Sequence, residues 1–212
     1  MLTHAKQAGI ARFSKSTTLI APPPRRAAAL PAEERRTMIV NATLPLLLEH
    51  GEMVTTRQIA EAAGIAEGTI FRVFADKDEV ITAVLESALD TAPLERHLSE
   101  IDHSLPLEDA LTAAVEILQQ RVVDIWRLVS SVPTRLHEKT RRPVTDIDAL
   151  TALIRAHRSQ LRVEPREAAR YLRTITLSAT HPMMVGEPMA PDEIVQLFLH
   201  GASSKQFKGK RC

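Results

Sequence analysis

The chain has little of what builds disulfide-rich, membrane-spanning or sheet-rich proteins. Its 212 residues include one cysteine, Cys212, so no disulfide can form within the chain. A lone thiol also fits the reducing cytoplasm, which is where we expect the protein. Glycines number only 7 and aromatic residues make up 3%, and no segment shows the strict alternation of a half-buried strand. No run of 18 uncharged apolar residues occurs, so no membrane span is expected.

The most prominent pattern in the sequence is the recurrence of apolar residues at helical spacing. Hydrophobic residues make up 44% of the chain, and Ala, Leu, Arg and Glu are abundant, which favours helix. A long stripe of apolar residues at steps of three and four runs from Leu107 to Val132. Shorter stripes follow at 147–161, 168–179 and 194–201. Several helices with separate apolar faces are expected to pack as a bundle, so the predicted fold class is all-α.

The net charge of +1 conceals a segregation along the chain. Residues 1–32 carry five Lys or Arg and no acid, whereas residues 33–90 carry five basic and eleven acidic residues. The segment 203–212 is again basic, with four Lys or Arg and no acid. Residues 1–32 fit a disordered extension, a start codon placed too early, or an arm that follows a DNA minor groove. Residues 203–212 are expected to be a frayed basic tail.

The segment 54–80, VTTRQIAEAAGIAEGTIFRVFADKDEV, is the most informative part of the sequence. Thr55 is a natural N-cap, and Gln58 follows it at the spacing of a capping box. The helix that begins there has one apolar face, made by Ile59, Ala62 and Ala63. Gly64 is placed to end this helix, because glycine adopts the left-handed conformation without a Cβ penalty.

A second helix of similar length is expected to follow this glycine. Its inward-facing residues are Ile70, Val73 and Phe74. Two short helices joined by a tight glycine turn form a helix-turn-helix, whose second helix can enter the DNA major groove.

Three pieces in this order resemble the DNA-binding domain of TetR/AcrR-family transcriptional regulators. They are IVNATLPLLLEHG at 39–51, TTRQIAEAAGI at 55–65 and AEGTIFRVFADKDEV at 66–80, the last including the family's Phe-x-x-Lys junction. Beyond residue 90 the resemblance is only architectural. It implies an N-terminal three-helix DNA-binding domain at 33–80 and a helical effector-binding and dimerisation domain at 81–202. The basic segments 1–32 and 203–212 flank them.

The resemblance also implies which side chains meet DNA. Arg57 and Lys77 fall where phosphates are contacted, and Arg72 is placed to bond guanine O6 and N7 together. The other expected contact positions are Thr55, Thr56, Gly68, Thr69 and Phe71. Each has a plainer alternative: the arginines as solvated side chains, Thr55 as a helix cap alone, and Phe71 as a packing residue.

Four positions depart from the family pattern, and one of them, Pro45, is expected to kink the first helix because it removes a backbone hydrogen bond. Phe71 stands where tyrosine is usual, so a phosphate-binding hydroxyl is missing. Ala66 replaces the common serine or threonine cap, which costs the recognition helix about 1 kcal/mol. Glu67 replaces a frequent lysine and would repel phosphate unless it turns away.

The resemblance implies two tasks for the second domain. The helices expected at about 166–182 and 192–202 would dimerise, with close approach permitted by small residues: Ala168, Ala169, Ala179, Gly201 and Ala202. The bundle would also hold a small-molecule effector. Its candidate lining residues, which can equally be plain core, are Trp126, His137, His157, His181, Met183 and Met184.

No metal site, cofactor or enzymatic activity is expected. The sequence shows no His/Cys/Asp/Glu cluster at metal-ligand spacing, no glycine-rich phosphate loop and no Ser/His/Asp set. The leading interpretation is a cytoplasmic, homodimeric regulator of transcription that binds a palindromic double-stranded DNA operator. It would be a repressor released by a small-molecule effector. The alternatives are an effector-independent DNA-binding or interaction module, and a helical enzyme fused to a DNA-binding head.

Overall fold

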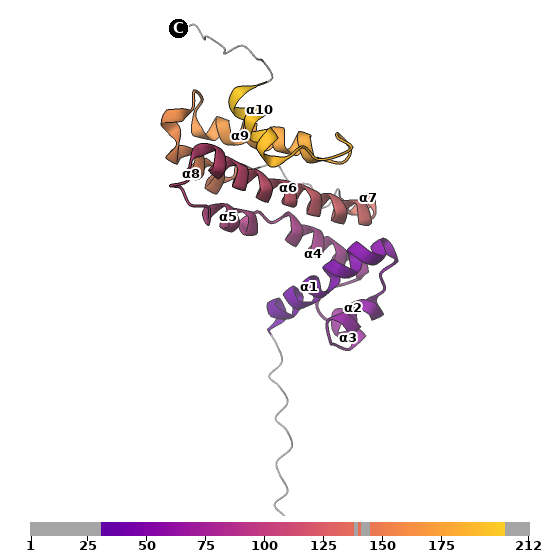
Figure 1. Ribbon diagram of the computed structural model, residues 1–212. Coiled ribbons are helices and arrows are strands. Elements are labelled where there is room, and N and C mark those ends of the chain that lie inside the picture. The colour runs from indigo at the N-terminus through magenta and orange to yellow at the C-terminus, as the bar shows by residue number, and fades with distance from the viewer. Residues whose placement is uncertain (1–30, 138–139, 141–144, 202–212) are drawn as a thin grey trace, which may run out of the picture. The chain divides into compact units, whose positions relative to one another are not determined.

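The computed structural model describes residues 31–137, 140 and 145–201, and these residues form helices joined by turns, with no strand among them (Figure 1). The all-α prediction is therefore confirmed. We call the first four α-helices the head: α1 (Ala32–His50), α2 (Thr56–Ala62), α3 (Glu67–Ile70) and α4 (Lys77–Leu89), with the 3-10 turn η1 (Gly51–Met53). We call the rest the bundle: α5 (Ala92–Ser99), α6 (Leu107–Ser131), α7 (Thr134–His137), α8 (Asp148–Ala156), the 3-10 turn η3 (Arg158–Gln160), α9 (Pro165–Thr180) and α10 (Pro191–His200). None of the described helices is long and apolar enough to cross a bilayer.

The head has its own hydrophobic core. Phe74 and Ile70 lie buried in it, as predicted, against Ile39 and Leu47 of α1. On α2 the prediction was partly wrong, because Ala62 is exposed and the buried neighbour of Ile59 is Ala60. Helix α4 gives this core its largest share of buried residues: Val80, Ile81, Ala83, Val84 and Leu85. The domain boundary predicted between residues 80 and 81 falls inside α4 and stays a prediction.

The far end of α6 and the short helix α7 complete the core of the head. Leu128, Val132 and Leu136 are buried in the same cluster as α1 and α4. At the end of α1, Gly51 has a φ of +57°, and a Cβ atom there would lie 2.9 Å from the main-chain oxygen of Ser131. A side chain at this position would meet backbone, so the glycine permits α6 to approach the head closely.

The bundle is organised around α6, which packs against α9 and α10 and also against α5 (Figure 1). Leu111, Ala114 and Val115 of α6 are fully buried, together with Leu150, Leu153 and Ile154 of α8. The predicted stripe is therefore buried in the first half of α6. Val122 and Ile125 in its second half are only half-buried.

Helix α5 is tied to the start of α8 by one carboxylate. The oxygens of Glu95 accept hydrogen bonds from the main-chain N–H groups of Asp148 at 2.9 Å and Ala149 at 2.7 Å. Ile147, the N-cap residue of α8, offers no side-chain acceptor, so Glu95 supplies the missing cap from another helix.

The small residues of α9 were expected to lie against a partner helix in a dimer, but they pack inside the chain. Ala168, Ala169 and Ala179 are at most 8% exposed and belong to the core of the bundle. They permit close packing of helices within one chain, so they are not free to meet a partner. Gly201 is exposed, and Ala202 lies outside the described residues.

Candidate nucleic-acid interface

The first helix of the helix-turn-helix begins and ends as the sequence predicts. The Thr55 hydroxyl accepts from the N–H of Gln58 at 3.2 Å, and the Gln58 side chain accepts from the N–H of Thr55 at 2.8 Å, which is a capping box. The Thr55 hydroxyl also donates to Oε1 of Gln58 at 2.8 Å. Its proton is thus engaged in the free chain, and a phosphate contact by Thr55 stays a prediction. Gly64 has a φ of +66° and closes the helix with bonds from its N–H to Glu61 and from the N–H of Ile65 to Ala60.

The second helix is shorter than predicted. Helix α3 covers only Glu67–Ile70, and the chain continues to Phe74 through tighter turns, with bonds from Arg72 to Thr69 and from Val73 to Ile70. Ala66 makes no side-chain cap, and Gly68 lies within the single α-helical turn that makes up α3. An uncapped start and an internal glycine both weaken a helix by about 1 kcal/mol, which accounts for the shortening.

An exposed face follows from this geometry. Arg57, Gly68 and Arg72 are all exposed, and Phe71 is 50% exposed. Thr69 is half-buried. Among the described residues, no hydrogen bond or ion pair holds the guanidinium of Arg57 or of Arg72. The two arginines are therefore accessible, and half of the Phe71 ring is open to solvent.

Thr56 and Glu67 engage each other across this face. The Thr56 hydroxyl donates a short hydrogen bond to Oε1 of Glu67, which joins the start of α2 to the start of α3. The bond turns the Glu67 carboxylate toward α2. It also uses the hydroxyl proton of Thr56 that was expected to bind phosphate.

Lys77 lies where the sequence placed it, at the start of α4, but it is engaged inside the protein. Its Nζ donates to the main-chain oxygens of Glu52 at 2.9 Å and Val54 at 3.0 Å. Two of the three ammonium protons are thus hydrogen-bonded to the turn that precedes α2. In the free chain Lys77 therefore joins α4 to this turn, and its contact with phosphate stays a prediction.

Sequence reasoning missed Arg36 as a structural residue of the head. Its guanidinium lies 4.4 Å from the centre of the Phe74 ring and 3.6 Å from Oε1 of Glu79. The stacked cation stabilises the end of the helix-turn-helix from α1. A separation of 38 residues leaves no local pattern that would have revealed this contact.

The residues proposed to line an effector pocket do not come together as one cavity. Trp126 and His181 pack edge to face, with ring centres 4.5 Å apart. Met183 and Met184 are 76% and 65% exposed, so they wall no enclosed cavity within the single chain. His157 is buried at the end of α8 and its Nε2 has no partner among the described residues. The side chain of His137 lies outside the described residues.

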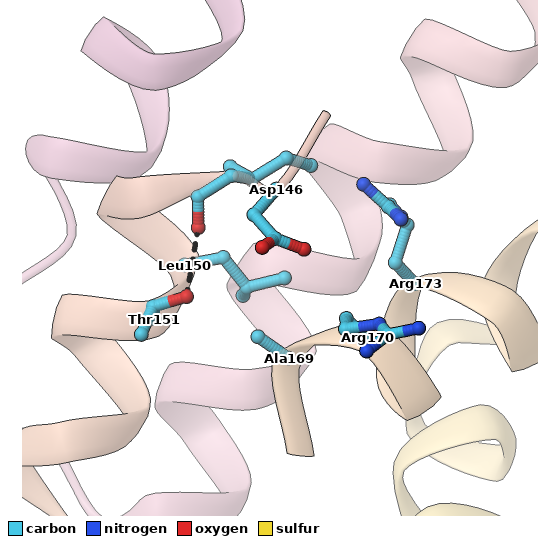
Figure 2. Close-up of a pocket in the computed structure, with 7 residues that line it drawn as sticks. Asp146, Leu150, Thr151, Ala169, Arg170 and Arg173 are labelled. Atoms are coloured by element: carbon cyan, nitrogen blue, oxygen red, sulfur yellow. Dashed lines mark hydrogen bonds between the residues drawn. The ribbon is translucent and has the colours of Figure 1, made fainter. Parts of the chain in front are cut away.

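One narrow seam between α8 and α9 is closed. Asp146, Leu150, Thr151, Ala169, Arg170 and Arg173 line it, and Figure 2 shows Arg173 reaching from α9 toward the segment that carries Asp146. Arg166 pairs with Asp146, and Arg173 donates to the main-chain oxygen of Thr145. The seam leaves no volume for a water molecule, so it is a packed junction and offers no binding site.

A wider groove lies between α5 and α6. Its volume is about 410 Å³, and its lining includes Leu94, His97, Ile117 and Asp124. Arg121 lies in its wall, where Nη2 donates to the main-chain oxygen of Asp90 at 2.7 Å. Burial lowers the pKa of Arg121, and the nearby Asp90 and Asp124 partly oppose this shift. The guanidinium stays charged at neutral pH, because an arginine titrates far above it.

Comparison with known proteins agrees with the geometry of the head. Residues 39–84 match the sequence profile described as "Bacterial regulatory proteins, tetR family". Over these residues the N-terminal domain of the chain is similar to that of tetR-family regulators. The HTH-type transcriptional regulator HbdR from Aromatoleum sp. (strain CIB) is 38% identical to the chain over 74 residues. That match covers 34% of this chain and only 32% of HbdR.

Solved structures of TetR-family proteins share the fold over most of the chain. A TetR-family regulator from Mesorhizobium loti MAFF303099 has a TM-score of 0.58 at 13% identity, covering 80% of this chain and 97% of that one. FadR from Bacillus subtilis, solved in complex with stearoyl-CoA, has a TM-score of 0.52 at 14% identity. The match covers 79% of this chain and 99% of FadR. At such identities the likeness concerns the fold alone.

Proposed function

We propose that the protein is a sequence-specific regulator of transcription that binds a palindromic operator as a homodimer in the cytoplasm. The observation that carries this proposal is that Arg57 and Arg72 are exposed and make no hydrogen bond or ion pair with any described residue, on a helix-turn-helix similar to that of tetR-family regulators. Arg57, in the first turn of α2, suits a phosphate. Arg72, just after α3, suits a guanine edge in the major groove.

The acidic composition of the head does not oppose DNA binding. What matters is the charge on the surface that faces DNA, and the carboxylate nearest that surface, Glu67, is turned toward Thr56. The main-chain N–H groups at the start of α3 lack a side-chain cap, so they remain donors for a phosphate. Gly68 has no atom within 4 Å of an added Cβ, so DNA backbone has room to approach there.

Dimerisation is proposed through the outer faces of α9 and α10. Tyr171 and Leu177 on α9 are 53% and 42% exposed in the single chain, so both are available to a partner. Phe198 and Leu199 of α10 are half-buried and border the same side of α9, because they line one groove with Tyr171. A partner helix laid on this surface would bury Tyr171, Phe198 and Leu199, while Leu177 lies about 120° further round the exposed side of α9.

The regulator is further proposed to be a repressor that a small-molecule effector releases from the operator. FadR, a structural relative, binds stearoyl-CoA, which gives one example of a small molecule held on this fold. The bundle of the present chain offers a groove of about 410 Å³, a size in the usual range of ligand sites.

The test is selection of DNA fragments from a genomic library by the purified full-length protein, followed by footprinting. We expect one motif with two-fold symmetry and half-sites about one helical turn apart. A family of unrelated fragments with no shared motif would contradict sequence-specific regulation and favour a general DNA-binding module. Turnover of a metabolite by the purified full-length protein, without any retention of DNA, would favour the enzyme alternative.

A further inference from the structure

The loop between α9 and α10, residues 181–190, gathers side chains that bind soft metal ions. Three of the six methionines of the chain, Met183, Met184 and Met189, fall within it, and His181 begins it. Met183 and Met184 are 76% and 65% exposed, although methionine ordinarily fills gaps in a core. Packing within the chain therefore does not account for these two side chains, and their thioethers lie at the surface.

A tight turn brings three of these ligands close together along the chain. The carbonyl oxygen of His181 accepts hydrogen bonds from the N–H of Met184 at 2.8 Å and from the N–H of Val185 at 3.1 Å. The far end of the loop returns to the same place, because the N–H of Met189 donates to the carbonyl oxygen of Ala179 at 3.0 Å. The base of the loop is thus closed by hydrogen bonds, and the turn at its start carries an imidazole and two thioethers.

His181 directs a nitrogen lone pair toward this turn. Its Nδ1 accepts from the N–H of Met183 at 3.3 Å, so the proton of the neutral ring is on Nε2. The bond is longer than most hydrogen bonds in proteins, so a metal ion can replace it at little cost. The indole of Trp126 packs against the imidazole, with ring centres 4.5 Å apart, and holds the ring beside the loop.

We propose that His181, Met183 and Met184 form a surface site for a soft monovalent metal ion, copper(I). Thioether sulfur selects copper(I) over magnesium, calcium and manganese, which prefer oxygen ligands, and imidazole also suits copper. One imidazole and two thioethers make a neutral ligand set, which suits an ion of single charge. The sequence predicted no metal site from the spacing of His, Cys, Asp and Glu, and thioethers add ligands for soft ions only. The inference does not rest on the proposed function, because the loop lies outside the helix-turn-helix.

The experiment titrates the full-length protein with silver nitrate in a chloride-free buffer, where silver(I) replaces copper(I) as an ion that does not change its oxidation state. The reference protein carries Cys212→Ser, because the single thiol of the chain would also bind soft ions. Fluorescence of Trp126, the only tryptophan, reports binding beside His181. We expect a saturable change that is complete at a single silver ion per chain. Zinc(II) at the same concentrations should leave the fluorescence unchanged.

The variants separate a metal site from an apolar contact surface. Met183→Leu/Met184→Leu keeps the apolar side chains and removes both sulfurs. It should lose at least about tenfold in silver affinity, since even outer-shell partners of a metal are worth that much. His181→Phe keeps an aromatic ring beside Trp126 and should show a loss of similar size. The matched control is Met53→Leu, at a 78% exposed position of the head, which should bind silver like the reference protein.

Circular dichroism on each variant checks that the helices persist. An undiminished silver affinity in the double leucine variant would overturn the proposal and leave the two methionines as an apolar contact surface. An equal loss in the Met53 variant would overturn it too, as would zinc(II) bound as tightly as silver(I). The titration is then repeated with copper(I) under anaerobic conditions against a competing chelator. The same order of variants is expected, and a copper(I) affinity that ignores the leucine substitutions would refute the assignment to copper.

Discussion

The side chain of Arg121, in the middle of α6, holds the main chain of Asp90 at the end of α4, with 2.7 Å between Nη2 and the carbonyl oxygen. A helix ends with carbonyl groups that lack partners, and a cation there is favourable. Thirty-one residues separate the two positions, so this bond fixes one helix of the head against the bundle.

Replacing Arg121 by methionine should loosen the last turn of α4 while the apolar stem of the side chain is kept. We expect about 1 kcal/mol less stability in urea unfolding, because one charged hydrogen bond is lost. Hydrogen exchange of the amides of residues 86–90 should become faster. The control Arg127→Met changes an exposed arginine on the same helix, and it should change neither quantity.

Gly51→Ala should destabilise the fold by about 2 kcal/mol or more. The positive φ strains any residue with a Cβ, and the new atom would press on the Ser131 carbonyl. Denaturant unfolding measures the loss. Gly186→Ala is the matched control, since nothing lies within 4 Å of its Cβ position and its φ is not in the positive range. Equal stability of the two variants would show that α6 does not press on Gly51.

Lys77→Met should act on stability, whereas Arg57→Met should act on DNA binding. Loss of the bonds to Glu52 and Val54 is expected to cost about 1–2 kcal/mol of unfolding free energy. Arg57→Met should leave stability unchanged and lower the slope of log affinity against log salt by about 0.9 per subunit. A reduced salt slope in the Lys77 variant at unchanged stability would instead assign Lys77 to phosphate binding.

Arg72→Ala should cost about 1–3 kcal/mol of operator affinity and relax the preference at one base pair in each half-site. The exposed position of Arg72 and its lack of an intramolecular partner in the described chain predict no change in unfolding. Repeating the fragment selection with the variant gives the answer. The same motif at the same affinity would remove Arg72 as a base reader.

The variant Tyr171→Asp should dissociate the dimer. Burying a carboxylate without a partner in an apolar interface is costly, so the mass from light scattering should fall from twice 23.5 kDa to 23.5 kDa. Leu48→Asp, at a 49% exposed position of the head, is the control and should remain dimeric. A wild-type mass of 23.5 kDa at micromolar concentration would refute the dimer itself.

Local features of this protein were predictable, and contacts between distant segments were not. The Thr55–Gln58 capping box and the Gly64 turn involve residues within ten positions, so their chemistry is visible in the sequence. The bonds of Lys77 and Arg121 to main-chain carbonyls, and the cap that Glu95 gives α8, join segments 23 to 54 residues apart. A carbonyl acceptor exists at every residue, so no residue type marks the partner.

The alanines of α9 illustrate a second limit. A small side chain lets helices approach closely whether the neighbour belongs to the same chain or to another. The pattern of Ala168, Ala169 and Ala179 therefore identified a close contact correctly and assigned it to the wrong partner. The same holds for Met183 and Met184, whose apolar character alone does not distinguish an enclosed wall from an exposed loop.

The contribution of Leu128, Val132 and Leu136 to the core of the head limits how this protein can be recombined with its relatives. A chimera that joined this head to a foreign bundle after α4 would leave a hole where those three side chains lie. To transplant the DNA specificity proposed for it, an engineer would have to exchange the surface residues of α2 and α3 alone, or move the end of α6 together with the head. Natural exchange of heads between proteins of this fold would face the same constraint.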